Sequence, residues 1–160
     1  MDNIYDRRHW LIRGHDGKNF KSSKYPFWGV KRGRGGCIKT IVNKFKQGDI
    51  LWFITSKPYG GKIIGMSEYK HYYDREDEPL IPIHTYSNNE QNWKGNSNWS
   101  IQIHYTNLYS TEEQNIEAII QCSSIILDYE TFKDRGLPDL YTHYKNFKYY
   151  SKPNNLIPCI

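Results

Sequence analysis

The clearest hydrophobic pattern in the chain is a pair of apolar runs separated by a turn. Ile50–Ile54 reads Ile-Leu-Trp-Phe-Ile, which is typical of a strand buried on both faces. Ser56–Gly61 contains a proline and two glycines and therefore predicts a turn. Lys62–Tyr69 follows as a second strand, in which Gly65 indicates a bulge or a close backbone approach. We therefore predict an antiparallel hairpin over Asp49–Tyr69, at the middle of a sheet.

Three further segments show a readable period. His9–Arg13 predicts a short strand that Gly14 ends. Cys37–Phe45 has its apolar residues at helical spacing and predicts a one-sided helix, stopped before Gly48. Trp99–Tyr105 alternates between apolar and polar residues and predicts a half-buried strand.

The remaining segments give weaker signals. The later part of the chain predicts a helix from Ser110 to about Gln121, a strand at Ser124–Leu127, a helical turn from Asp128 through Phe132 and a helix at Asp139–Tyr149. Polar loops are expected at Gly14–Tyr25, Lys31–Gly36 and much of Lys70–Asn98, with a short aromatic island at Pro26–Val30.

Composition favours one domain rich in β-structure. A chain of 160 residues is long enough for a single core. Hydrophobic residues make up only 38%, but 16% of residues are aromatic, and rings pack well on pleated surfaces. The net charge of +5 and the pI near 9.0 favour a polyanionic partner.

Cysteine usage and the absence of targeting signals indicate an intracellular protein. Cys37, Cys122 and Cys159 form no CxxC pair, so neither a disulfide framework nor a thiolate metal site is expected. No basic-apolar leader and no apolar run long enough to span a membrane is visible.

The common catalytic and metal-binding patterns are missing. The six histidines form no HxxxH or HExxH pair, and no GxSxG motif occurs. The acidic cluster of Asp74, Glu76, Asp77 and Glu78 is expected to be a solvated loop rather than a cation site. The basic loop Arg32–Gly36 matches neither common phosphate-binding motif, which leaves contact with a nucleic-acid backbone as its functional interpretation. No cofactor and no enzymatic activity are expected.

Two tryptophans stand out by their surroundings. Trp10 and Trp52 lie within strand patterns and are expected in the core. Trp28 and Trp93 lie among polar residues, glycine, asparagine and serine, where a ring either joins the core or lines a pocket or stacking platform. Composition does not decide between these two roles.

Several short motifs follow one another along the chain. They are the island Ser22–Trp28, the triplet Trp28-Gly29-Val30, the Gly-x-x-x-Gly-x-x-Glu segment Gly61–Glu68 and Trp93-Lys94-Gly95 before the strand at Trp99. In this order they resemble the PUA-like superfamily, in its branch of YTH and EVE modified-base reader domains. The resemblance covers about His9 to Phe132. It implies an α+β fold for residues 1–135, a curved and partly closed β-barrel flanked by two or three helices, with residues 136–160 as a C-terminal tail.

The resemblance also implies a binding site. Trp28 and Trp93 would be two walls of an aromatic cage, with their rings face to face around a flipped-out modified base. Asn19 would hydrogen-bond the base, His15 would lie near it, and the backbone carbonyl of Gly14 would accept its methylamino N–H.

The same resemblance implies a nucleic-acid partner. Lys31, Arg32, Arg34 and Lys94 would contact phosphates on either side of the base. The implied partner is RNA, or DNA that is single-stranded or has a flipped base, bound by a monomer with no membrane contact.

This chain departs from the family in ways that leave the ligand open. Arg13-Gly14 replaces a Lys-Ser pair, and a third cage aromatic would fall near Asn88. Modified cytosine in DNA, an EVE-type ligand, therefore stays open beside methyladenine. Two other functions also stay open. One is a hydrolase of modified nucleosides like those of the related ASCH domains, with Lys62 and Glu68 as its candidate pair, although the ASCH spacing Gly-x-Lys-x-x-Glu-x-Arg is absent. The other is a protein-interaction module without a base pocket.

Overall fold

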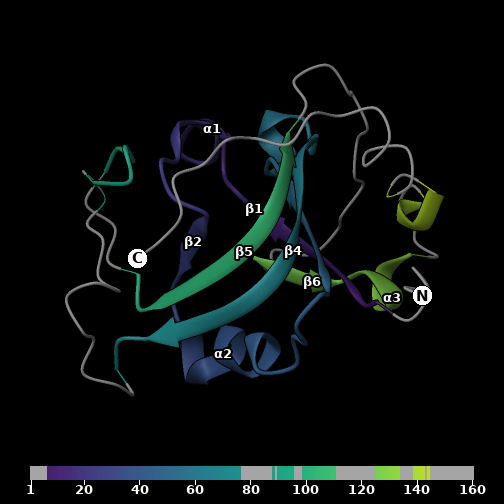
Figure 1. The fold of residues 1–160 in the computed structure, drawn as a ribbon, viewed down its shortest axis with the longest axis horizontal. Coiled ribbons are helices and arrows are strands. Elements are labelled where there is room, and N and C mark those ends of the chain that lie inside the picture. Colours follow the sequence, from purple (N-terminus) through teal and green to yellow (C-terminus); the bar gives the residue numbers. More distant parts are fainter. Residues whose placement is uncertain are drawn as a thin grey trace.

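The computed structural model describes residues 7–76, 88, 90–95, 99–110, 125–133, 139–142 and 144. Its six strands form one mixed sheet in the order β2-β5-β4-β3-β1-β6, with β1 parallel to β3 and the other neighbours antiparallel (Figure 1). The strands are β1 His9–Arg13, β2 Phe27–Val30, β3 Ile50–Ile54, β4 Ile63–Asp74, β5 Ile101–Ser110 and β6 Ile126–Asp128. The domain is therefore α+β, as predicted. Among the described strands no pairing joins β2 to β6, so the predicted barrel closure is not seen.

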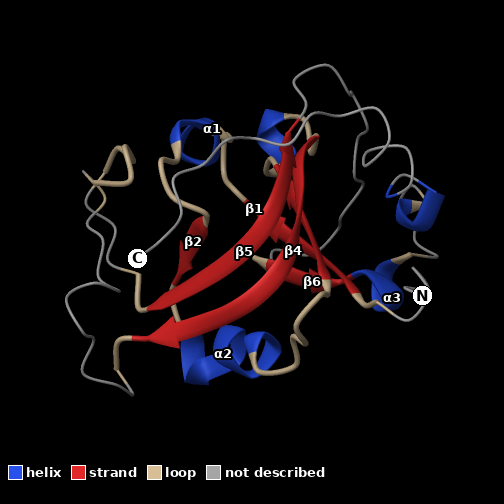
Figure 2. Ribbon diagram, viewed as in Figure 1, coloured by secondary structure: helices blue, strands red, loops and turns tan. Residues whose placement is uncertain are grey.

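The predicted hairpin lies at the middle of this sheet. All five residues of β3 are buried, and β3 pairs antiparallel with β4. Gly65 of β4 provides the predicted close approach, because a Cβ there would lie 2.5 Å from Cζ of Phe20. The strand β4 runs to Asp74, so the start of the stretch predicted as a loop is instead strand. Figure 2 shows β4 and β5 as long curved strands that cross the whole domain.

The sheet is covered on both faces, which explains the uninterrupted apolar run of β3. One face contributes Leu51 and Phe53 to a core cluster that also contains Ile38 and Val42. The other face contributes Trp52 to a second cluster, whose members include Tyr129, Leu140 and Tyr144. Because successive strand residues point to opposite faces, a strand between two cores has to be apolar throughout.

The helices are short, and only some were predicted. Helix α2 (Cys37–Val42) lies within the predicted helix but ends earlier, and Phe45 is buried beyond its end. Helix α3 (Tyr129–Phe132) is capped by the Asp128 carboxylate, which accepts a hydrogen bond from the Glu130 N–H, as expected. Helix α1 (Lys18–Ser22) lies in a segment predicted as loop, and single 3₁₀ turns occupy Arg34–Gly36 (η2) and Lys57–Tyr59 (η3).

Two strand predictions were wrong in detail. The island at Pro26–Val30 is not a loop, since Phe27–Val30 forms β2 and pairs with β5. Residues 101–105 of β5 are buried on both faces, not half-buried, and the strand continues to Ser110. The helix predicted over 111–121 and most of the one over 139–149 lie outside the described residues. No helix in the described part of the chain is long and apolar enough to cross a bilayer.

Candidate functional site: an aromatic pocket beside a basic cavity

Strand β2 presents Trp28 at the edge of the sheet. Trp28 is opposite Ile103 of β5, and its ring is only partly buried. The next residue, Gly29, leaves room for the ring of Trp99, because a Cβ there would lie 2.5 Å from the Cγ and Cδ2 atoms of that indole. The glycine in Trp-Gly-Val therefore lets a third tryptophan lie against the strand. The sequence predicts Trp99 only as part of a strand, and Gly29 is the signal that could have revealed this packing.

A buried glutamine holds the segment that carries Trp93. The Gln91 side chain accepts hydrogen bonds from the backbone N–H groups of Lys24 and Tyr25, at 3.0 and 2.6 Å. It donates to the carbonyls of Tyr25 and Phe27, at 2.8 and 3.1 Å. The Trp93 indole N–H donates to Ser23 Oγ at 2.7 Å. These contacts fix residues 91–93 against the start of β2, and neither Gln91 nor Ser23 was predicted as a site residue.

Asn19 fixes the same segment from helix α1. Its Oδ1 accepts the Lys94 backbone N–H at 3.0 Å, and its Nδ2 donates to the Lys94 carbonyl at 3.2 Å. Both polar groups of the side chain are therefore engaged with the backbone. In this structure Asn19 positions the loop that follows Trp93, instead of presenting a free amide to a base.

The three tryptophan rings form a corner and not a slot. The rings of Trp28 and Trp93 have centroids 5.1 Å apart and an interplanar angle of 63°. Trp93 and Trp99 meet in the same way, at 5.8 Å and 70°. The prediction of two parallel rings with an empty gap between them is therefore wrong for this structure. Trp28 is the most exposed of the three, since Trp93 and Trp99 are only 8% and 7% exposed.

A pocket of about 380 Å³ opens at this corner. Its lining contains six of the predicted site residues together with Trp99, Asn88 and Ile125: these six are His15, Asn19, Trp28, Lys31, Trp93 and Lys94. Asn88, where a third cage aromatic was expected, instead accepts the Trp99 indole N–H at 2.8 Å. Trp99 thus supplies the third aromatic wall from another position in the chain.

Gly14 lies behind this pocket. It is buried, and its carbonyl accepts the Gly17 N–H at 2.8 Å while its own N–H donates to Ile54. The predicted acceptor is therefore already used in the turn that leads into α1, and Gly14 is not among the lining residues.

A basic cavity of about 570 Å³ adjoins the aromatic pocket and shares Lys31 and Trp99 with it. Its other lining residues include Arg32, Arg34 and Arg75. The Arg75 guanidinium lies 4.0 Å from the centroid of the Trp99 ring, a cation–π contact, and burial lowers the pKa of Arg75. Lys31 and Arg34 are exposed at this cavity.

Arg32 has a structural partner in the buried carboxylate of Asp74. Arg32 Nε lies 2.8 Å from Asp74 Oδ2 and 2.7 Å from Glu76, and Lys39 Nζ lies 2.7 Å from the same Asp74 oxygen. Burial by itself would raise the pKa of Asp74, but hydrogen bonds from Lys39, the Glu76 N–H and Arg32 outweigh burial and lower it. Asp74 therefore anchors β4 to α2 and engages Arg32, which weakens the prediction that Arg32 mainly contacts phosphate.

The alternative catalytic and metal sites find no geometric support. No group of three or more His, Cys, Asp or Glu residues in the described part of the chain is placed to hold a metal ion. Of the predicted acidic cluster, positions 77 and 78 lie outside the described residues. Glu68 pairs with Arg7 at 2.8 Å, while Lys62 is exposed.

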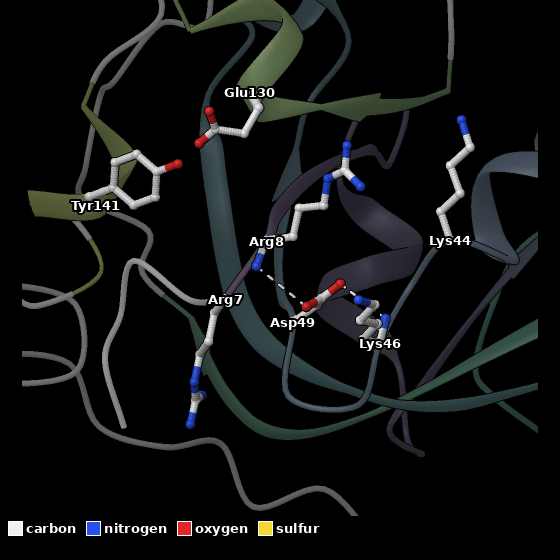
Figure 3. Close-up of a pocket in the computed structure, with 7 residues that line it drawn as sticks. All are labelled: Arg7, Arg8, Lys44, Lys46, Asp49, Glu130 and Tyr141. Atoms are coloured by element: carbon white, nitrogen blue, oxygen red, sulfur yellow. Dashed lines mark hydrogen bonds between the residues drawn. The ribbon is translucent and has the colours of Figure 1, made fainter. Parts of the chain in front are cut away.

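A further pocket, of about 240 Å³, lies where the chain enters β1 (Figure 3). Asp49 lies at its base and accepts the backbone N–H groups of Arg8 and Lys46, as well as the Trp10 indole N–H. The Arg8 guanidinium pairs with Asp128 at 2.6 Å. These contacts tie the starts of β1 and β3 together, so we assign this pocket a structural role.

Comparison with solved structures finds two similar folds. The crystal structure of the Pho92 YTH domain in complex with m6A is 12% identical, with a TM-score of 0.49 over 92% of this chain and 86% of that chain. The structure of a hypothetical protein from Leishmania major is 14% identical, with a TM-score of 0.39 over 96% and 90% of the two chains. No protein-family model and no curated protein matches the sequence. The first of the two structures is a YTH domain, the family whose motifs this sequence resembles.

Proposed function

We propose that this protein binds a modified base in a nucleic acid, with a methylated base in RNA or single-stranded DNA as the first candidate. The observation that carries the proposal is the pocket of about 380 Å³ bounded by Trp28, Trp93 and Trp99. Its volume lies in the range of small-ligand pockets, and indoles are the side chains on which unpaired bases stack best. The proposed activity is binding and not catalysis.

The corner arrangement defines how the base would be seated. Because Trp28 and Trp93 already touch edge to face, the base stacks on one ring while the others form side walls. Trp28 is the candidate for the stacking ring, because it is the most exposed of the three. Trp93 and Trp99 are held by hydrogen bonds and keep the corner in shape.

The energies are sufficient for a reader of modification. Stacking of one base on an aromatic side chain contributes about 1–3 kcal/mol. Burial of one methyl group adds about 0.8 kcal/mol, and one hydrogen bond made or broken adds about 1 kcal/mol. The last two contributions distinguish a methylated from a plain base by about ten- to hundred-fold.

The adjoining basic cavity fits the phosphates beside such a base. Lys31 lines both the aromatic pocket and the basic cavity, so its ammonium group lies where a strand would pass from one to the other. Arg34 is exposed in the basic cavity, and Lys94 is exposed at the aromatic pocket. Affinity for any strand should therefore fall as the salt concentration rises.

The test is the affinity of pocket variants for a methylated oligonucleotide. We expect Trp28→Ala to weaken binding about five- to hundred-fold, because one stacking surface is removed. Trp52→Phe is the matched control, since Trp52 lies in the core on the other side of β3 and does not line the pocket. Equal affinities for wild type and Trp28→Ala would contradict the proposed site.

A further inference from the structure

The exposed large hydrophobic side chains of the described structure gather at the mouth of the aromatic pocket. Tyr59 is 48% exposed and Ile125 is 39% exposed, and no other large hydrophobic residue in the described part reaches this exposure. Ile125 lines the pocket directly. Tyr59 contacts His15, which also lines it. Exposed apolar surface concentrated beside a pocket indicates a binding surface.

The Tyr59 ring rests on His15 in a defined geometry. Their ring centroids are 4.9 Å apart at an interplanar angle of 66°, and the Tyr59 hydroxyl lies 3.5 Å from His15 Nε2. Tyr59 comes from the turn between β3 and β4, and His15 from the loop between β1 and α1. Two segments far apart in the sequence thus build one aromatic surface.

The backbone under this surface is fixed. His15 has a left-handed backbone conformation with φ 52°, which is uncommon for a residue other than glycine. Its carbonyl accepts the Ser56 N–H at 2.7 Å, and the Tyr59 carbonyl accepts the Thr55 hydroxyl at 3.2 Å. Strained backbone held in place by its surroundings is concentrated at functional sites. The exposed rings are therefore positioned before any ligand arrives.

Positive charge accompanies the aromatic surface. Arg13 lines the pocket, and its backbone N–H donates to the Ile125 carbonyl at 2.9 Å, which places it between His15 and Ile125 along the rim. Lys57 is exposed in the same turn as Tyr59. A phosphate that links two nucleotides across the rim would meet cations on both sides of His15.

We infer that Tyr59 and His15 form a stacking platform for the nucleotide next to the one in the aromatic pocket. This inference rests on the proposed function and deepens it, because it makes the ligand a single strand of at least two nucleotides and not a free nucleoside. The neighbouring base stacks on Tyr59, and unpaired bases of any identity can do so. Double-stranded nucleic acid is excluded from the platform unless both bases leave the stack.

The test compares Tyr59→Ala with wild type on two ligands, a methylated nucleoside and a single-stranded pentanucleotide with the methylated base at its centre. We expect the variant to bind the pentanucleotide about five- to hundred-fold more weakly and to bind the nucleoside as wild type does. Tyr59→Phe keeps the ring and should keep the affinity. Since Tyr59 is exposed in a turn, its truncation leaves the core intact.

Abasic ligands make the assignment specific. Pentanucleotides that lack the base 5′ or 3′ of the methylated one should bind wild type more weakly on one of the two sides, and that ligand should bind Tyr59→Ala and wild type equally. An affinity loss in Tyr59→Ala that is the same for both abasic ligands as for the intact strand would overturn the platform. So would a wild type that binds the nucleoside as tightly as the pentanucleotide. A wild type that binds neither ligand would instead refute the proposed function itself.

Discussion

Substitution of Gly29 by alanine tests whether the packing of Trp99 against β2 shapes the pocket. A Cβ at this position would lie 2.5 Å from Cγ and Cδ2 of Trp99, far inside van der Waals contact. Trp99 cannot move away freely, because its indole N–H is bonded to Asn88 and Arg75 covers its ring. The strain must therefore be absorbed by displacing the third wall of the pocket or by shifting β2.

The size of the effect follows from overpacking. One extra methyl group in a filled site costs about 1–3 kcal/mol. In a domain of this size each kcal/mol lowers Tm by roughly 2–4 °C. Gly14→Ala is the matched control, because a Cβ there would meet its nearest neighbours at 3.8–3.9 Å and Gly14 has no left-handed φ. We expect that control to change stability by no more than about 0.5 kcal/mol.

The assay combines thermal unfolding, tryptophan fluorescence and titration with a methylated oligonucleotide. Gly29→Ala should lower Tm, change the tryptophan emission and weaken binding, while Gly14→Ala should leave all three near wild type. If Gly29→Ala has the Tm and emission of wild type, Trp99 does not lie against Gly29 and the pocket lacks its third wall.

Three further predictions concern the surroundings of the pocket. Gln91→Ala should destabilise the protein by at least about 1–3 kcal/mol, because it leaves buried backbone groups without their partner, and should raise quenching of Trp93 by acrylamide; unchanged quenching would show that Gln91 does not hold this segment. The stability gap between wild type and Asp74→Asn, measured by urea unfolding, should be complete above the ordinary carboxyl pKa of about 4 and should close as the pH falls through the lowered pKa of Asp74, whereas a gap independent of pH would contradict the assignment. Joint replacement of Lys31 and Arg34 by alanine should reduce the slope of log affinity against log salt by about 0.7–0.9 for each phosphate that the variant no longer neutralises, without changing the preference for a methylated base; an unchanged slope would place the phosphates elsewhere.

The sequence predicted those elements whose signal is local. The run Ile50–Ile54 could be recognised because a strand between two cores is apolar at every position. Asp128 could be recognised because a capping side chain acts on the next few residues. Helix α1 was missed because five residues with Phe20 alone buried show no periodic stripe.

Features that depend on distant contacts were mostly missed. Trp28 lies in a strand only because β5 pairs with it, and the polar residues at the end of β4 are strand for the same reason. The sequence placed Asn19 at the pocket but not its bonding to Lys94, which is 75 positions away. The angle between Trp28 and Trp93 likewise depends on how Gln91 fixes the intervening chain.

The central claim is that the three-tryptophan corner distinguishes a modified base from a plain one. The most direct measurement is the affinity of the wild-type protein for two single-stranded oligonucleotides that differ only by one methyl group on the central base. The account predicts that the methylated strand binds about ten- to hundred-fold more tightly. Equal affinities across methyladenine- and methylcytosine-containing pairs would contradict it.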